Sequence, residues 1–365
     1  MKLSAADQKK LLPHLRRTTE AIEEILTSGL TTANEGTCQT FGVTFQEVSS
    51  MKLLRLGSTL RNTYEEVRRY VKDDPRFSQT RLMFFLNRSW LLCRGIEKAV
   101  DDKDAPQLEK LLWTAPAKKV KSLSVVCLGV VKKIAAGSFC AFDFRLRDVK
   151  TGRPLNWSTV FPMKADTEIP AEGYLHMPQK QKFKAGVFLE RQVVNITDAA
   201  ITEADDASAV IRLTDDSKVT AADPFEDWEQ FLTWEADAAV RRIQQHDISP
   251  FDVETELQEE VVFGDYQLGK EDTSETDRIV FPLTYRNTEF DLTVSSSLEG
   301  KSAVKELKAA GKKKSCSALY GLMHYAACRL VVQPLTLFTN NKPEYITISD
   351  SSVDRKALLS ALRFT

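Results

Sequence analysis

Residues 142–152 alternate strictly between apolar and charged side chains and then turn, reading Phe142-Asp143-Phe144-Arg145-Leu146-Arg147-Asp148-Val149-Lys150-Thr151-Gly152. A period of two places Phe142, Phe144 and Leu146 on one face of a strand and the charged side chains on the other. After the turn, the same alternation returns with Leu155, Trp157, Thr159 and Phe161. This pattern predicts a β-hairpin with one buried face.

The flanking segments extend this hairpin into a small sheet. An apolar run rich in β-branched residues occupies 125–131, and a further strand is expected at 186–194 after a polar loop at 174–184. Four or five strands with a long second hairpin resemble a closed barrel of the oligonucleotide- and oligosaccharide-binding (OB) type. We therefore expect an OB-like antiparallel β-barrel over residues 118–200, and a half-sandwich of the same strands is the alternative.

The region before Pro116 has helical periodicity instead. Apolar residues recur every three or four positions over 4–26, 45–71, 78–100 and 105–113. These segments predict a helical bundle over residues 1–115. Trp90 continues the stripe begun by Leu82 and Leu86, so we expect it to pack in the bundle core.

The remainder of the chain predicts an acidic linker with a helix at 224–246 (residues 201–278), followed by a mixed α/β domain (residues 279–365). Within that domain we expect a hairpin at 279–285 and 289–295, helices at 301–310 and 315–330, and strands at 335–339 and 345–348. A last helix at 353–364 ends without a cap, which we interpret as a sign that the protein is truncated there. The predicted fold class is α+β and multidomain.

Composition supports a folded protein of the cytoplasm. The chain has 365 residues, 42% of them hydrophobic and 28% charged, which is typical of globular domains. No stretch approaches the roughly 18 apolar residues of a membrane span, so no membrane partner is expected. The six cysteines are scattered without a C-x-x-C pair and are interpreted as reduced thiols.

The net charge of -1 conceals a strong segregation of charge along the chain. Residues 113–200 contain 14 Lys and Arg against 7 Asp and Glu, whereas residues 201–280 contain 6 against 22. An acidic surface attracts a basic partner by long-range electrostatics, although it can also be only a solvated face. On the predicted helix at 224–246, four acidic residues face solvent. These protein-binding candidates are Glu226, Asp227, Glu229 and Asp237.

A second set of candidates belongs to the predicted barrel. Basic residues that follow phosphates, with aromatic residues between them, are what single-strand binding requires. The nucleic-acid-binding candidates are Arg145, Arg147, Lys150, Arg153, Lys182 and Lys184. Trp157, however, shares the alternation of Phe161, which indicates a core position rather than a stacking surface.

The sequence offers no catalytic, metal-binding or cofactor-binding constellation. His324 and Cys328 are four residues apart and Cys316 is nearby, but no fourth ligand accompanies them. Residues 311–315 resemble the end of a phosphate-binding loop but lack the upstream glycine. We therefore expect a protein without enzymatic activity, metal or cofactor.

Two stretches carry a resemblance to a known family, namely 77–81 through 90–95 and 173–179 through Phe188. With the order of a helical region before a barrel, the chain resembles the N-terminal part of the protein substrate of type III-E CRISPR systems. The resemblance implies cleavage by a caspase-like (TPR-CHAT) peptidase of the effector complex, beyond Thr365, and a role in antiviral defence through binding and restraining a sigma factor. The alternative function is an OB-type nucleic-acid-binding accessory protein.

Overall fold

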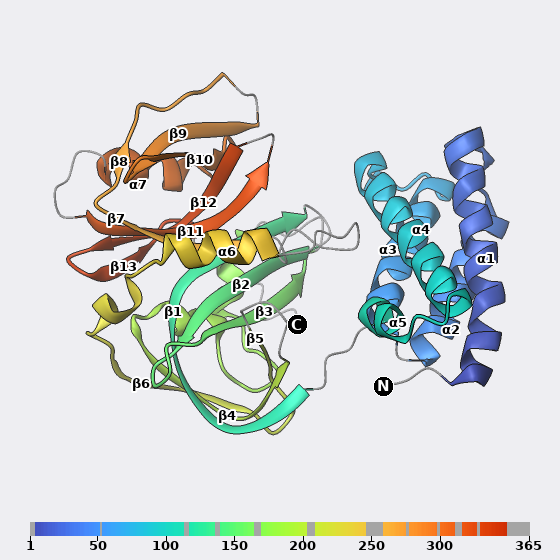
Figure 1. The fold of residues 1–365 in the computed structure, drawn as a ribbon, viewed down its shortest axis with the longest axis horizontal. Coiled ribbons are helices and arrows are strands. Elements are labelled where there is room, and N and C mark those ends of the chain that lie inside the picture. The colour runs from blue at the N-terminus through green and yellow to red at the C-terminus, as the bar shows by residue number, and fades with distance from the viewer. Residues whose placement is uncertain are drawn as a thin grey trace. The chain divides into compact units, whose positions relative to one another are not determined.

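The computed structural model describes residues 4–51, 53–112, 117–135, 139–163, 169–202, 209–245, 258–274, 277–297, 300–310, 316–326 and 329–348. These residues form two compact units, which meet in the sequence between residues 112 and 117 and are described separately. Helices make up the first unit and strands dominate the second (Figure 1), which confirms the predicted α+β class. Among the described helices, none is long and apolar enough to cross a bilayer. The predicted helix at 353–364 lies outside the described residues.

The first unit is a bundle of five α-helices and one 3-10 turn. They are α1 (Ala5–Ser28), η1 (Leu30–Thr32), α2 (Glu35–Ser50), α3 (Leu54–Val71), α4 (Gln79–Asp101) and α5 (Ala105–Leu112). The helix predicted at 45–71 is wrong, because the chain leaves the helical conformation at Leu53 and two helices result. Val48 and Leu53 are both buried on the two sides of this break, so the break lets each helix turn its apolar face to one core.

Trp90 lies at the edge of this core rather than fully inside it. Its ring packs against the buried cluster and remains partly exposed. Its indole N–H donates a hydrogen bond of 2.9 Å to the Glu23 carboxylate on α1. Trp90 therefore ties α4 to α1 through both apolar packing and a polar contact.

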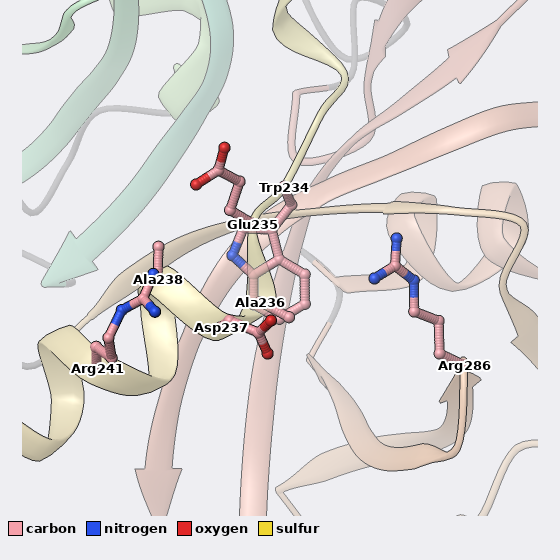
Figure 2. A pocket seen from close by; sticks show the side chains of 7 residues that line it. All are labelled: Trp234, Glu235, Ala236, Asp237, Ala238, Arg241 and Arg286. Carbon is pink, nitrogen blue, oxygen red and sulfur yellow. The ribbon is translucent and has the colours of Figure 1, made fainter.

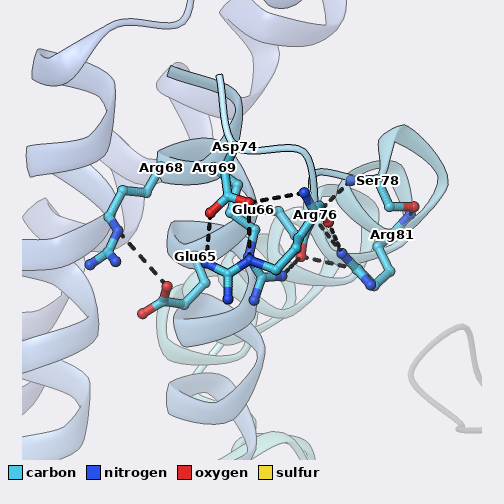
Figure 3. A network of polar contacts seen from close by, with 8 residues as sticks. All are labelled: Glu65, Glu66, Arg68, Arg69, Asp74, Arg76, Ser78 and Arg81. Atoms are coloured by element: carbon cyan, nitrogen blue, oxygen red, sulfur yellow. Dashed lines mark hydrogen bonds and ion pairs between the residues drawn. The ribbon is translucent and has the colours of Figure 1, made fainter. Parts of the chain in front are cut away.

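A buried carboxylate fixes the turn between α3 and α4 (Figure 3). Glu66 accepts hydrogen bonds from the Arg81 side chain at 3.0 Å and the Ser78 amide at 3.2 Å, and it also pairs with Arg69. Ser78 in turn caps α4 by accepting from the Arg81 amide. A buried carboxylate needs such donors to replace lost water, so this network sets where α4 begins.

The second unit begins with a closed barrel. Its strands are β1 (Ala117–Ala135), β2 (Phe139–Asp148), β3 (Pro154–Pro162), β4 (Gln192–Thr202), β5 (Ala209–Arg212) and β6 (Lys218–Pro224). They pair in the order β1-β2-β3-β5-β4, and β4 returns to β1. The β3–β5 pairing is parallel and all others are antiparallel. This closed five-stranded order is that of the OB fold, and its strands extend past the predicted boundary at residue 200.

The segment between β3 and β4 caps one end of this barrel. It contains two 3-10 turns, η2 (Ala171–His176) and η3 (Ala185–Leu189), where part of a strand had been predicted from residue 186. Tyr174 and Phe188 from these turns are buried in the barrel core with Phe144 and Trp157. Trp157 is therefore a core residue, as its alternation predicted.

The strands beyond residue 258 form a second barrel with the same order. They are β7 (Glu259–Gly264), β8 (Gln267–Leu268), β9 (Arg278–Tyr285), β10 (Thr288–Ser295), β11 (Cys316–Ala326), β12 (Arg329–Thr339) and β13 (Lys342–Tyr345), with α7 (Lys301–Ala310) between β10 and β11. β7 pairs with β11 and β8 pairs with β9, so these two short strands act as one first strand. The parallel pair is β10–β12. The C-terminal region thus repeats the topology of the first barrel.

The helix predicted at 315–330 is wrong, because this segment forms β11 and the start of β12. Both faces of β11 are buried. Leu319 and Met323 enter the core of the second barrel, whereas Tyr320 and Leu322 enter a separate cluster between the barrels. A strand with apolar residues on both faces shows no alternation of period two, so its sequence pattern can be mistaken for that of a buried helix.

The junction between the two barrels is a third apolar cluster. β1 supplies alternate side chains to two cores, since Val125 and Val130 lie in the first barrel while Val126 and Leu128 lie in the junction. β11, β12 and the 3-10 turn η4 (Trp228–Phe231) supply the opposite side. The two barrels are therefore packed together through a third cluster, which is separate from the core of each barrel.

Hydrogen bonds reinforce this junction. β1 pairs with β4 only as far as Val125 and continues to pair with β2 as far as Ala135, so beyond Val125 the carbonyl groups that β2 does not bind need other partners. The hydroxyls of Thr336, Tyr345 and Thr347 donate to the carbonyls of Leu128, Cys127 and Val130 at 2.6, 3.0 and 2.7 Å. The second barrel therefore satisfies part of the backbone of the first.

We expect Gly129→Ala to destabilise the second unit. A Cβ at this position would lie 2.7 Å from a ring carbon of Tyr320 and 3.0 Å from the Leu335 Cβ. Overpacking of this kind costs about 1–3 kcal/mol, which urea unfolding of the protein would measure. Gly264→Ala is the control, because its nearest neighbour would lie at 3.8 Å. Equal unfolding free energies for the two variants would contradict a tight junction.

Candidate nucleic-acid interface

The outward surface of β2 and β3 carries two exposed apolar side chains. Because Phe142 and Phe144 point into the barrel, the alternate residues Phe139, Ala141 and Asp143 point outward. Phe139 is 38% exposed. On β3, Val160 stands opposite Ala141 and is 62% exposed. Phe139 and Val160 are thus exposed on this surface, whereas Ala141, which pairs with Val160, is only 6% exposed.

A charge pair borders this surface. Lys133 on β1 stands opposite Ala141 and forms an ion pair of 2.9 Å with Asp143. The Lys133 side chain is half exposed. The apolar residues and the lysine together define what we call the β2–β3 face, namely Phe139, Ala141, Val160 and Lys133.

The candidates Lys182 and Lys184 lie on a tight turn that is docked on the barrel. The Gln179 amide donates to the Phe183 carbonyl at 2.7 Å, and the Gln179 side chain accepts from the Thr159 hydroxyl of β3 at 3.1 Å. This turn therefore holds both lysines in place at the surface, where both are exposed. It adds positive charge to the end of β3 that carries Val160.

Lys150 and Arg153 occupy the turn between β2 and β3. The Asp148 carboxylate accepts from the Lys150 and Thr151 amides at 3.0 and 2.8 Å, which fixes the turn. Both basic side chains are exposed. Since Phe139 begins β2 and Asp148 ends it, this pair lies at the opposite end of the strand from Phe139.

Arg145 and Arg147 are placed differently from the other candidates, because both are shielded from solvent. Arg145 is buried, and Arg147 forms an ion pair of 2.5 Å with Glu260 on β7, each side chain being 14% exposed. Burial alone would raise the pKa of Glu260, but Arg147 and then Arg145 lower it below its ordinary value. The pKa of the neighbouring Tyr320 rises, because of burial and then of the Glu260 charge. These arginines hold the barrels together rather than face a ligand.

The structure does not bring the four acidic candidates onto one helix. The helix predicted at 224–246 is wrong at its start, since α6 spans only Ala236–Gln245 and η4 precedes it. Glu226, Asp227 and Glu229 lie in and before η4, and Asp237 lies in the first turn of α6; all four are exposed. Glu226 pairs with Lys342 at 3.0 Å. Phe225, Trp228 and Phe231 pack together and anchor the segment.

The residues weighed for metal or phosphate chemistry do not assemble a site in the described ranges. No three His, Cys, Asp or Glu side chains lie close enough there to hold a metal ion. Cys328 and residues 311–315 are outside the described ranges. Burial raises the pKa of Cys93 and Cys127 to about 12, so these thiols stay protonated and unreactive.

Phe139 and Val160 were missed by the sequence analysis. The signal was available, because Phe139 lies on the same alternation as Asp143 and Arg145, two steps back along the strand. Its outward position makes it exposed, whereas an apolar residue near a run of phenylalanines is easily taken for core. Because the nearby Phe142 and Phe144 are core residues, Phe139 was not recognised as exposed from the sequence.

Comparisons with known proteins give no family. No family model matches the chain, and no curated protein matches it. Among solved structures, it is similar to the Ifi202 HINa domain in complex with 20-bp dsDNA, at 9% identity, 60% of this chain, 94% of that chain and a TM-score of 0.30. It is also similar to a Replication Protein A heterotrimer bound to ssDNA, at 11% identity, 60% of this chain, 49% of that chain and a TM-score of 0.27. The OB assignment rests on the strand order of the barrels, since TM-scores this low carry no argument.

We expect Arg147→Met to destabilise the second unit by about 3–5 kcal/mol near neutral pH, because it removes the ion-pair partner of the shielded Glu260 carboxylate. In the unchanged protein the Glu260 pKa is depressed below 4.5, so its contribution is present above that pH and lost as the pH falls. In the variant, burial raises this pKa and protonation favours folding. The gap in unfolding free energy should therefore shrink between about pH 7 and about pH 4. A gap that is constant with pH would contradict the buried pair.

Proposed function

We propose that the protein binds single-stranded nucleic acid through the β2–β3 face of its first barrel. The observation that carries the proposal is the exposed Phe139 ring beside Val160 and Lys133, on the surface that OB folds use for oligonucleotides. Aromatic rings stack on bases of any sequence, and nearby lysines neutralise phosphates. The chemistry is therefore suited to a strand without strict sequence preference.

The charge of the first barrel supports the same ligand. Among its described residues, exposed bases outnumber the exposed acids Glu190, Asp198, Asp215, Asp216 and Asp223. The exposed bases are Lys118, Lys119, Lys121, Lys133, Lys150, Arg153, Lys180, Lys182, Lys184, Arg191, Arg212 and Lys218. Of these, Lys182 and Lys184 lie at the same end of β3 as Val160. A single nucleic-acid strand that crosses the β2–β3 face would thus pass positively charged side chains at the end of β3 that carries Val160.

Phe139→Ala tests this proposal, with a labelled oligothymidylate of about 15 nucleotides as the probe. Loss of one stacked base costs about 1–3 kcal/mol, so we expect the affinity measured by fluorescence anisotropy to fall about 5- to 150-fold. Lys182→Gln with Lys184→Gln should instead flatten the dependence of affinity on salt. Phe84→Ala is the matched control, because Phe84 is an exposed aromatic residue on α4, 58% accessible. Equal binding by the two phenylalanine variants would refute a stacking role.

A second proposal concerns the acidic segment. Glu226, Asp227 and Glu229 project from a turn anchored by the buried Trp228 and Phe231, so their charges are held at fixed positions in water. Fixed charges of one sign favour a basic protein partner. The resemblance to the type III-E substrate would make that partner a sigma factor, restrained until the caspase-like peptidase cleaves the chain.

Neutralising the acids tests this second proposal. We expect Glu226→Gln, Asp227→Asn, Glu229→Gln and Asp237→Asn together to slow association with a sigma factor of the kind that the resemblance implies, because charges at a rim act on association rate. Stopped-flow measurements at low and moderate salt would show the slowing mainly at low salt. Rates unchanged at both salts would leave this segment as solvated surface only.

A further inference from the structure

A polar cavity lies where α6 begins, beside the β9–β10 turn of the second barrel. It has a volume of about 320 Å³ and is lined by Trp234, Glu235, Ala236, Asp237, Ala238, Arg241 and Arg286. This volume is at the lower end of small-molecule sites, which span about 300–1,000 Å³. A ligand the size of one nucleotide therefore fits it better than a longer molecule does.

Two guanidinium groups flank the cavity. Arg241 comes from α6 and Arg286 from the β9–β10 turn, and they lie on opposite sides of Trp234 and Asp237 (Figure 2). Both are exposed, and neither forms an ion pair with another described residue. Arg286 instead packs over the Tyr285 ring at 5.2 Å. Guanidinium groups of this kind bind phosphate oxygens through paired hydrogen bonds.

The Trp234 side chain provides a rigid aromatic wall. Its ring packs on Phe263, Tyr285 and Phe290, with centroids 5.4, 5.9 and 6.4 Å away. The same side chain lines the cavity and is only partly buried. A base that stacks on it would meet a surface that needs no reordering, which favours binding.

The carboxylates of Glu235 and Asp237 balance the two arginines in charge. A bare phosphate therefore gains little here, because the carboxylates oppose it. The cavity favours a ligand with an anionic end for the arginines and an N–H donor end for a carboxylate, which only accepts hydrogen bonds. Guanine offers two adjacent N–H donors on its Watson–Crick edge, more than any other common base.

We propose that this cavity binds a guanine nucleotide. The base stacks on Trp234, the Asp237 carboxylate accepts from its Watson–Crick edge, and the arginine on one side of the base, Arg241 or Arg286, holds the phosphate. This inference stands apart from the β2–β3 face, because the cavity is built by α6 and the second barrel. The nucleotide can be free or can be the 5′-phosphorylated end of a strand.

Calorimetric titration with GMP tests the proposal, with AMP and inorganic phosphate as comparison ligands. We expect GMP to bind more tightly than AMP, and phosphate to bind weakly. Of Arg241→Gln and Arg286→Asn, the variant that removes the arginine holding the phosphate should lower the GMP affinity about tenfold or more, since a hydrogen bond to a charged group is worth about 1.5–3 kcal/mol. Asparagine is chosen at position 286 because the backbone there has a φ of 47°, which asparagine tolerates.

Matched variants separate this site from the rest of the molecule. Lys305→Gln, an exposed lysine on α7, and Phe139→Ala should both leave GMP binding unchanged. Asp237→Asn should remove the preference for GMP over AMP while keeping most of the phosphate contacts. An oligothymidylate with a 5′-phosphorylated guanosine that competes with GMP would identify a strand end as the source, and failure to compete would identify the free nucleotide.

Three results would overturn the proposal. The first is an absence of GMP binding up to about 1 mM, which corresponds to a binding free energy of about -4 kcal/mol. The second is equal affinities for GMP and AMP. The third is GMP binding that neither arginine variant weakens. Phe139→Ala affects only the proposed binding of a nucleic-acid strand. The strand-binding proposal and the GMP proposal can therefore be refuted independently of each other.

Discussion

The packing of β1 against β11 and β12 is the contact on which the rest of the second unit depends. Gly129 has no Cβ, so Tyr320 and Leu335 can approach the β1 backbone closely. The Thr336 hydroxyl then reaches the Leu128 carbonyl, which β4 no longer approaches in register. Because close-packed interiors resist deformation, two barrels that share such a cluster behave as one body.

This shared cluster decides which surfaces remain available. The C-terminal half of the outward β2 surface is shielded from solvent, because Arg147 forms an ion pair with Glu260 across the junction. In the N-terminal half, Phe139 stays exposed, whereas Ala141 is buried and Asp143 is half-buried. The same topology occurs twice, yet the outward surfaces differ in charge, because β10 of the second barrel presents Glu289 and Asp291.

The segment that connects the barrels has more than a linking role. Trp228 and Phe231 fill the junction, and six residues after Trp228 the chain places Trp234 on the aromatic cluster of the second barrel. Its acidic residues are consequently displayed on a well-anchored support rather than on a free chain. Five acids of residues 201–280 are thus divided between a surface turn, with Glu226, Asp227 and Glu229, and the wall of a cavity, with Glu235 and Asp237.

The sequence by itself determined the helical class of the first unit and, in the second unit, the first barrel with its hairpin at 142–161, because helices and half-buried strands each leave a periodic pattern of apolar residues. It also indicated that Trp157 belongs to the core. Only the tertiary structure decided the nature of β11, the burial of Arg145 and Arg147, and the exposure of Phe139. The reason is that periodicity reports whether a face is apolar or polar, whereas the partner that covers it comes from residues far away in the chain. Glu260 lies more than a hundred positions from Arg147, and nothing local to either residue specifies their pairing.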